Sequence, residues 1–252
     1  MNITGNTILI TGGSAGIGRG LAEALHALGN QVIIAGRRKE TLDETTTANP
    51  GMKSLILDDE DANAISTFAA RITTDYPALN VLINNAGIMR VENLLARPDD
   101  LADMEATITT NLLGPIRLTA ALLPHLQKQP QATIINVSSG LAFAPLALTP
   151  TYSATKAALH SYTQALRFQL RETTTQVIEL IPPLVATELT PGQSSNLRAM
   201  PLNDYIAESI NLLQTQPSAT EILVERVKFQ RFAADRGEYD TVFNTINNHV
   251  PS

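Results

Sequence analysis

Short apolar runs alternate with longer helical patterns along most of this chain of 252 residues. The runs are rich in Ile, Val and Leu and stop at Gly, Asn, Asp, Ser or Pro, which is typical of strands buried on both faces. They lie at 7–11, 31–35, 54–57, 81–83, 133–137 and 177–181. Strands joined through helices form parallel sheets. The pattern predicts an α/β fold: a Rossmann-type, doubly wound parallel sheet of six or seven strands with helices on both faces, as a single domain over residues 1–252.

Composition and charge argue against several other classes of protein. Apolar residues make up 44% of the chain, enough for a sizeable core, and the absence of Cys excludes disulfides and thiolate metal sites. The net charge is −6 and the only basic cluster is 37–39, so we expect no nucleic-acid partner. The chain starts without a basic leader, and no apolar run approaches about 20 residues, so we expect no membrane partner and a cytoplasmic location. The four His, at 26, 125, 160 and 249, lack metal-ligand spacing, so no metal site is predicted.

A Gly-rich loop, TGGSAGIG at 11–18, lies between the first predicted strand and the first predicted helix. Gly12 permits a tight turn there. Gly16 and Gly18 let the backbone come close to a pyrophosphate at the helix N-terminus, where free N–H groups attract anions. The alternative is a turn that merely starts a helix. The strand before the loop and the helix after it favour a dinucleotide-binding site.

The end of the second predicted strand bears on the choice of cofactor. An acid at this point would bind the ribose 2′-hydroxyl of NAD, but the sequence has Gly36 followed by Arg37 and Arg38. A guanidinium suits a 2′-phosphate through charge-assisted hydrogen bonds. A solvated basic loop is the alternative. The sequence predicts NADP(H), with NAD(H) less favoured.

A candidate proton-transfer site follows the strand at 133–137. Tyr152 and Lys156 are four residues apart in a predicted helix from about 151 to 171, so they share one face. A free phenol has a pKa of about 10, and a neighbouring cation should draw it toward neutrality. Ser139, at the end of the strand, can hydrogen-bond the same oxygen or a carbonyl. A solvated Tyr/Lys surface pair is the alternative.

In this order of motifs the chain resembles the short-chain dehydrogenase/reductases, and among them the DltE-like oxidoreductases. The resemblance rests on TGGSAGIG at 11–18, NNAG at 84–87, Asn111, Ser139, Tyr152 with Lys156, and the Pro-rich turn after 177–181, and it covers roughly the first 190 residues.

The resemblance implies a mechanism with four catalytic residues. Tyr152 would be the general acid or base, and Lys156 would lower its pKa and hydrogen-bond the nicotinamide ribose. Ser139 would orient the carbonyl, and Asn111 would hold a water that links Lys156 to solvent. The implied cofactor-binding residues are Gly12, Ser14, Gly16, Ile17, Gly18, Arg37, Arg38, Asp58, Asp59, Asn85, Ala86, Gly87, Tyr152, Lys156, Pro182, Val185 and Thr187. For the acidic run 58–61, capping of the next helix is a second interpretation, compatible with the first.

Three stretches depart from the family or vary within it. Pro183 stands where the family usually has Gly, so the turn that includes Val185 and Thr187 must differ locally. Residues 188–213 resemble a mobile flap over the substrate. Residues 218–252 appear helical in pattern and lack the usual Gly-rich last strand, so we expect the seventh strand to be absent and the tail to pack on a neighbour or over the site.

The sequence therefore predicts an NADP(H)-dependent oxidoreductase, a carbonyl reductase or alcohol dehydrogenase. Its substrate would be a ketone, aldehyde or secondary alcohol. An apolar or aryl group is favoured if Leu141, Phe143, Pro145, Leu146 and Leu148 line the pocket, although these side chains suit a core equally well. The alternatives are a catalytically silent NADP-binding sensor and an epimerase or dehydratase that uses the cofactor transiently. By family analogy we expect a homodimer or homotetramer formed through the helices at 101–128 and 151–171.

Overall fold

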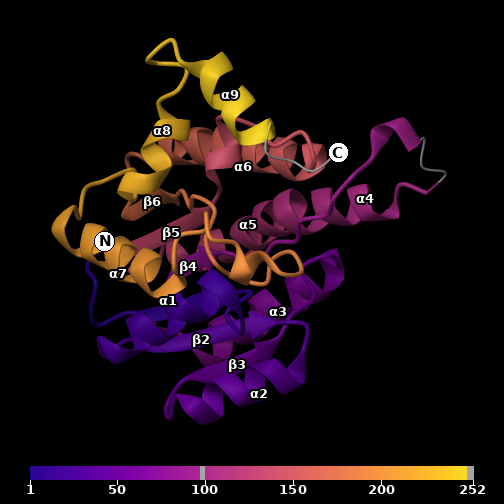
Figure 1. Ribbon diagram of the computed structural model, residues 1–252. Helices are drawn as coiled ribbons and strands as arrows, with labels where there is room; N and C mark the ends of the chain where they lie inside the picture. Colours follow the sequence, from indigo (N-terminus) through magenta and orange to yellow (C-terminus); the bar gives the residue numbers. More distant parts are fainter. Residues whose placement is uncertain (97–99, 249–252) are drawn as a thin grey trace.

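The computed structural model describes residues 1–96 and 100–248 (Figure 1). In these residues seven parallel strands form one sheet in the order β3-β2-β1-β4-β5-β6-β7. Their bounds are β1 Thr7–Thr11, β2 Gln31–Gly36, β3 Lys53–Ile56, β4 Leu79–Asn84, β5 Ala132–Val137, β6 Thr175–Leu180 and β7 Glu221–Ile222. The order reverses between β1 and β4, which makes their carboxyl ends a topological switch point. The predicted doubly wound α/β fold is confirmed.

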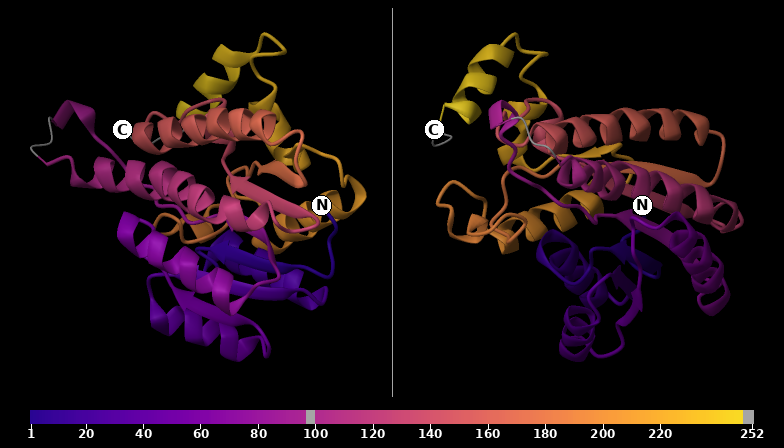
Figure 2. Two further views of the ribbon diagram at one scale, coloured as in Figure 1. Left: turned by 180° about the vertical axis from the view of Figure 1, so that it is seen from behind. Right: turned by 90° about the vertical axis from the view of Figure 1, so that its right-hand side faces the viewer.

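Helices cover both faces of the sheet (Figure 2). Helices α3, α5 and α6 pack on one face, and α1 and α7 pack on the other. The helix bounds are α1 Gly16–Ala27, α2 Lys39–Ala48, α3 Ala62–Asp75, α4 Ala102–Ile108, α5 Gly114–Leu126, α6 Pro150–Gln169, α7 Leu202–Thr215, α8 Lys228–Arg231 and α9 Tyr239–Asn247.

The core is divided between the two faces by the alternation of side chains along each strand. In β1, Ile8 and Ile10 pack toward α1 and α7, whereas Leu9 packs toward the other face. All three are fully buried. Burial of such a side chain contributes about 1.5–3 kcal/mol, which is why the central strand β1 is apolar at three successive positions and does not alternate with polar residues there.

Two local expectations need correction. The long helix expected at 101–128 is two helices, α4 and α5, joined by a π-helical turn at Thr109–Leu113 that ends immediately before Gly114. The seventh strand, expected to be absent, exists as the short β7, which pairs Glu221 with Glu179 and Ile222 with Leu180 of β6. Two residues are too few to show a strand period in the sequence.

The segment expected to be a flap has two different parts. Residues 188–200 form a loop that is tied back by a bridge between Val185 and Met200. From Leu202 onward the chain is helix α7, and its Tyr205 and Ile206 are buried against α1. The expectation of a mobile segment with few core contacts is therefore wrong for 202–213.

The tail after β7 folds back over α6, as Figure 1 shows for α8 and α9. Val242 of α9 packs with Ala144, in the loop between β5 and α6. Asn247 accepts a hydrogen bond from the Ala147 amide (2.6 Å) and donates one to the carbonyl of Pro145 (3.1 Å). The tail is therefore anchored to the loop that separates Ser139 from Tyr152.

Across the described ranges 1–96 and 100–248, none of the helices combines the length and apolarity needed to cross a bilayer.

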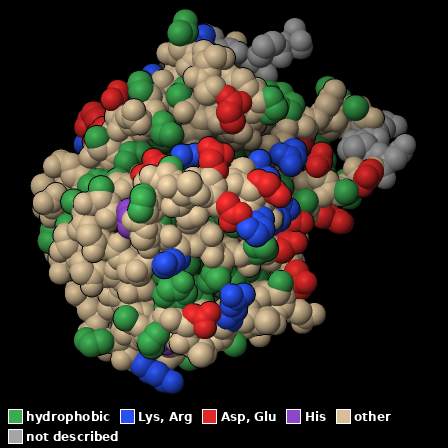
Figure 3. All heavy atoms as spheres, turned by 90° about the horizontal axis from the view of Figure 1, so that it is seen from below, with side chains coloured by type: hydrophobic (Ala, Val, Ile, Leu, Met, Phe, Trp, Pro, Cys, Tyr) green, Lys and Arg blue, Asp and Glu red, His purple; other side chains and the backbone are tan. Residues whose placement is uncertain are grey.

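On the face of the molecule shown in Figure 3, basic and acidic side chains are interspersed. That face therefore presents mixed charge and not a continuous basic surface.

Candidate active site

The predicted site residues follow the carboxyl ends of the strands, and parallel strands bring those ends to one edge of the sheet. Gly12 follows β1, Arg37 follows β2 and Asp58 lies just beyond β3. On the other half of the sheet, Asn85 follows β4, Ser139 lies just beyond β5, and Pro182 lies just beyond β6. Residues far apart in the sequence are thus collected along this edge.

The Gly-rich loop and the turn after β4 touch so closely that glycine is required. Gly12 has a φ of 63°. A Cβ on Gly18 would stand 2.3 Å from both the Asn85 Nδ2 and the Gly12 carbonyl oxygen. The side-chain amide of Asn85 donates to the Thr11 carbonyl (2.9 Å). The Thr11 hydroxyl accepts from the backbone N–H groups of Asn85 (3.1 Å) and Ala86 (3.0 Å). These contacts fix the loop against β4.

Helix α1 offers the anion site that a dinucleotide needs. Its N-cap, Ala15, makes no side-chain capping bond, so the first N–H groups of the helix are available to a phosphate. Gly16 has a φ of 51°, and a Cβ there would meet Thr187 at 3.4 Å. The loop after β6 therefore lies directly beside the phosphate loop. The residues present fit a dinucleotide cofactor, whose phosphates Ser14, Gly16, Ile17, Gly18 and Thr187 would surround.

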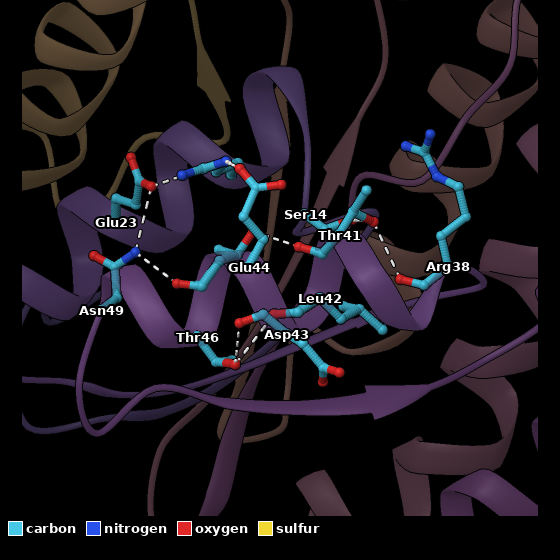
Figure 4. A network of polar contacts seen from close by, with 11 residues as sticks. Ser14, Glu23, Arg38, Thr41, Leu42, Asp43, Glu44, Thr46 and Asn49 are labelled. Atoms are coloured by element: carbon cyan, nitrogen blue, oxygen red, sulfur yellow. Dashed lines mark hydrogen bonds and ion pairs between the residues drawn. The ribbon is translucent and has the colours of Figure 1, made fainter.

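The end of β2 has room and positive charge for a 2′-phosphate. A Cβ on Gly36 would find its nearest neighbour, the Ser14 hydroxyl, at 3.9 Å. Thr41 donates to the Ser14 hydroxyl and to the Arg38 carbonyl, both at 3.1 Å, and in Figure 4 the guanidinium of Arg38 extends away from this network. Arg38 forms no ion pair with the described residues, whereas Arg37 binds Glu60 at 2.7 Å.

The acidic residues at 58–61, after β3, have different roles. Asp61 caps α3 by accepting from the amides of Asn63 (2.8 Å) and Ala64 (3.2 Å). Asp58 is exposed at the edge where the adenine was expected. Asp59 is half-buried, and burial, with the neighbouring Asp58 charge, raises its pKa to about 7. The capping interpretation therefore holds for Asp61, and Asp58 and Asp59 remain candidates for the cofactor.

The structure brings the four expected catalytic residues together. A Cβ on Gly87 would lie 3.2 Å from Asn111 Oδ1 and 3.6 Å from Lys156 Nζ, so both side chains converge on the turn after β4. Lys156 Nζ donates to the Val137 carbonyl (2.9 Å) and lies 5.5 Å from the centre of the Tyr152 ring. Ser139, Tyr152, Lys156 and Asn111 are all less than 9% exposed.

The pKa values differ from the expectation. Burial raises the pKa of Tyr152 to about 12, and a contact with Ser139 lowers it by less. Burial also lowers the pKa of Lys156 to about 8. The expected lowering of the Tyr152 pKa by Lys156 is therefore wrong for this structure. The physical reason is geometric: the ammonium lies over the ring and binds a carbonyl, so desolvation of the phenol dominates.

Asn111 holds the turn after β4 in place. It lies in the π-helical turn, a form that is frequent at functional sites. Its side chain accepts from the Ile88 amide and donates to the Ile88 carbonyl, both at 2.8 Å, and also donates to Thr155 at 3.3 Å. Both ends of the amide are thus used by protein groups, and the expected water-holding role of Asn111 stays a prediction.

The turn after β6 is ordered by its own contacts despite Pro183. The Pro182 carbonyl accepts from the Gly140 amide (2.8 Å), and Gln193 donates to the Val185 carbonyl (2.8 Å) and the Thr187 hydroxyl (3.3 Å). Val185 and Thr187 are buried. Gln193, on the loop 188–200, therefore positions the two residues expected to meet the cofactor.

Only some of the apolar side chains expected to line the substrate pocket are free to do so. Leu141, Pro145, Leu146 and Leu148 are half-buried in the loop after β5. Phe143, in contrast, stacks edge-on with His160 at 4.7 Å and lies under the guanidinium of Arg231 at 4.7 Å. Phe143 is therefore occupied by the contact with the tail.

Two surface cavities lie elsewhere in the fold. One of about 670 Å³ is lined by Met1, Gln131 and Gln176, among others, and one of about 310 Å³ lies between α1 and α7.

Sequence reasoning missed several residues that build the site. Glu92 accepts from the Thr151 amide (3.0 Å) and hydroxyl (2.8 Å), so it caps the helix that carries Tyr152. No local signal marks this contact, because the two residues come from different elements. Glu179 was detectable in principle, since it is a charge within the apolar strand β6. It lies with His160 and Glu221, whose ligand atoms are all within 4.8 Å of one another.

The other histidines make ordinary contacts. His26 binds the Pro50 carbonyl and His125 binds the Leu79 carbonyl, each at 3.1 Å. His249 lies outside the described residues.

Comparison with known proteins adds four findings. A family model described as short chain dehydrogenase matches residues 6–198. A protein of Bacillus subtilis named "Uncharacterized oxidoreductase DltE" is 41% identical over 251 residues, which is 98% of each chain. A short chain dehydrogenase from Burkholderia cenocepacia in complex with NADP has a TM-score of 0.81 at 25% identity over 100% of both chains. A metagenomic short-chain oxidoreductase, also in complex with NADP, has a TM-score of 0.74 at 29% identity, covering 88% of this chain and 97% of the other.

Proposed function

We propose that this chain is an NADPH-dependent carbonyl reductase. It belongs to the short-chain dehydrogenase family and resembles an oxidoreductase of that family over nearly its whole length. Its Tyr152 is buried beside Lys156 and Ser139. The observation that carries the proposal is that Lys156 and Asn111 converge on the turn after β4, next to the phosphate loop, with the Tyr152 ring 5.5 Å from the Lys156 ammonium. When a nicotinamide cofactor is held at this site, the hydride would come from that cofactor.

Tyr152 acts in this proposal as the proton donor. A pKa of about 12 keeps the proton on the phenol throughout the neutral range, so the group is present in the acid form that a reduction needs. Ser139 shares the neighbourhood of the phenol and has a hydroxyl that can donate to a carbonyl oxygen. Lys156 provides a buried ammonium, still largely charged at pH 7 because its pKa is about 8, to stabilise negative charge that develops on that oxygen.

The proposed preference for NADPH rests on Arg38 and on the absence of an acid at Gly36. Arg38 is the arginine available for a 2′-phosphate, since Glu60 holds Arg37. Both structural relatives described above are complexes with NADP. The space beside Gly36 makes a direct test possible, because a larger side chain fits there.

Gly36→Asp should reverse the cofactor preference by placing a carboxylate where the 2′-phosphate would bind. Gly36→Ala is the matched control, since it adds bulk without charge and should keep the preference. The measurement is kcat/KM with NADPH and with NADH for the three proteins. A wild-type preference for NADH of about tenfold or more, equivalent to about 1.4 kcal/mol, would refute the proposed cofactor.

We propose an apolar ketone or aldehyde as the substrate. The loops after β4 and after β6 flank the site and expose large apolar side chains, namely Val91, Leu94, Leu95, Leu184 and Leu197. The half-buried leucines of the loop after β5 add to this surface. Aryl and alkyl ketones should therefore be reduced faster than sugars or charged keto acids, as measured by NADPH oxidation across a panel. Equal or faster turnover of the charged substrates would contradict this part of the proposal.

The same panel separates the proposal from its rivals. Tight NADPH binding without oxidation on any carbonyl would favour a sensor. A changed substrate without net NADPH consumption would favour an epimerase or dehydratase.

A further inference from the structure

A buried carboxylate lies behind the proposed catalytic lysine and has no part in the mechanism above. Glu179 lies in the middle of β6 and is fully buried. Its Oε2 is 2.7 Å from His160 Nδ1, while its Oε1 has no hydrogen-bond partner among the described residues. A buried charge costs several kcal/mol unless other groups compensate for it, so its neighbours require explanation.

The neighbours of Glu179 come from three elements. The charged or titratable side chains that interact with it are Lys156, His160 and Arg167 from α6, Glu221 from β7 and Arg231 from α8. Arg167 is committed to two carbonyls, those of Val177 (2.9 Å) and Thr220 (2.8 Å). Glu221 is committed to Arg231 through two hydrogen bonds, of 2.8 and 3.1 Å. The positive charge that neutralises Glu221 is therefore the Arg231 guanidinium. This pairing argues against a metal ion at the cluster of His160, Glu179 and Glu221.

Helix geometry relates this cluster to the site. Tyr152, Lys156 and His160 follow one another at intervals of four residues along α6, so they occupy one face of the helix. Lys156 turns to the Val137 carbonyl at the end of β5, and Glu179 pairs in register with Asn136, the residue before it. Glu179 thus lies on the strand next to β5, at nearly the same level as the carbonyl that binds the Lys156 ammonium.

Lys156 has few other compensating groups. It is 4% exposed, and its one recorded hydrogen bond to a described residue goes to the neutral Val137 carbonyl. Burial lowers its pKa to about 8, and the charge of Glu179 acts in the opposite direction.

We propose that Glu179 is a positioning residue whose buried carboxylate supplies the counter-charge of the Lys156 ammonium, and that His160 together with the Arg231–Glu221 pair of the tail holds that carboxylate in place. The inference rests on the proposed function for its catalytic meaning. It also assigns a role to the tail, which is to hold His160 beside Glu179. Arg231 lies over the ring of Phe143, and that ring stacks on His160.

The test is a titration of Lys156 that does not depend on turnover. The chain has five lysines, so ¹³C-labelled lysine gives a simple NMR spectrum in which Lys156→Arg identifies the signal. Glu179→Gln keeps the shape of the side chain and removes its charge. We expect the midpoint of Lys156 to fall by about half a pH unit or more in this variant. If the enzyme reduces ketones, the alkaline limb of its pH–rate profile should shift by the same amount.

Two further variants make the result decisive. Glu172→Gln removes a carboxylate that is 84% exposed just after α6, and it should leave the midpoint unchanged. Arg231→Gln leaves the Glu221 charge uncompensated, and it should move the midpoint upward. An unchanged or raised midpoint in Glu179→Gln would overturn the proposal, as would an equal shift in Glu172→Gln. If Glu179→Gln does not fold, an unchanged midpoint in Arg231→Gln would overturn it.

The two proposals fail in distinguishable ways. Absence of NADPH oxidation by the wild type would refute the reductase, whereas the NMR titration would still report whether Glu179 and Lys156 are coupled.

Discussion

The capping of α6 by Glu92 should be worth about 2 kcal/mol of stability and should help to fix Tyr152. The N-cap residue Thr149 makes no side-chain capping bond, and Glu92 supplies both oxygens to Thr151 from the loop after β4. A cap contributes about 0.5–2 kcal/mol, and a negative charge at a helix N-terminus adds about 0.3–1 kcal/mol. Glu92→Ala should therefore lower the free energy of unfolding by about 2 kcal/mol. Glu92→Gln, which keeps one acceptor, should lower it by about 1 kcal/mol.

For a chain of 252 residues, 1 kcal/mol corresponds to about 2 °C in Tm. Calorimetry should therefore show a decrease of about 4 °C for Glu92→Ala and about 2 °C for Glu92→Gln. Glu172→Gln, at an exposed position, should differ from the wild type by less than about 1 °C. Because Tyr152 lies one residue beyond Thr151, kcat/KM should also fall while NADPH affinity is kept. An unchanged Tm in Glu92→Ala would refute the reasoning.

Two further predictions concern Asp59 and the tail. The folded protein holds the Asp59 proton up to about pH 7, whereas the unfolded chain loses it near 3.8, so wild-type stability falls as pH rises through this window. Asp59→Asn should therefore increase the free energy of unfolding by about 2 kcal/mol at pH 8 and leave it unchanged near pH 4. Denaturant unfolding of the protein without cofactor measures this difference. The same increase at both pH values would contradict the prediction. Asn247→Ala should raise KM for the carbonyl substrate about fivefold by freeing the loop at 145–147, whereas the exposed Asn244→Ala should not. Equal KM values for both variants would argue against the tail's hold on the loop.

The sequence predicted the sheet because its chemistry is local. Strands such as β1 and β5 have a continuous apolar centre and are buried at nearly every position, and turn residues mark where they stop. The parallel arrangement then placed Gly12, Asn85 and Ser139 at one edge without further information.

What the sequence did not reveal depends on partners that are distant along the chain. The pKa of Tyr152 is set by how completely the fold encloses the phenol, and no spacing rule expresses that. Glu179 finds His160 on another element, and Glu92 finds Thr151 across 59 residues. Helix α7 seemed a mobile flap because burial of Tyr205 becomes evident only once α1 is placed beside it.

The most direct test of the account is the rate of NADPH-dependent ketone reduction by Tyr152→Phe compared with the wild type, with NADPH binding measured by fluorescence. Loss of the phenolic proton donor should lower kcat by about a hundredfold to ten-thousandfold while the Kd for NADPH changes little. A Tyr152→Phe enzyme that reduces the same ketone at the wild-type rate would contradict the account.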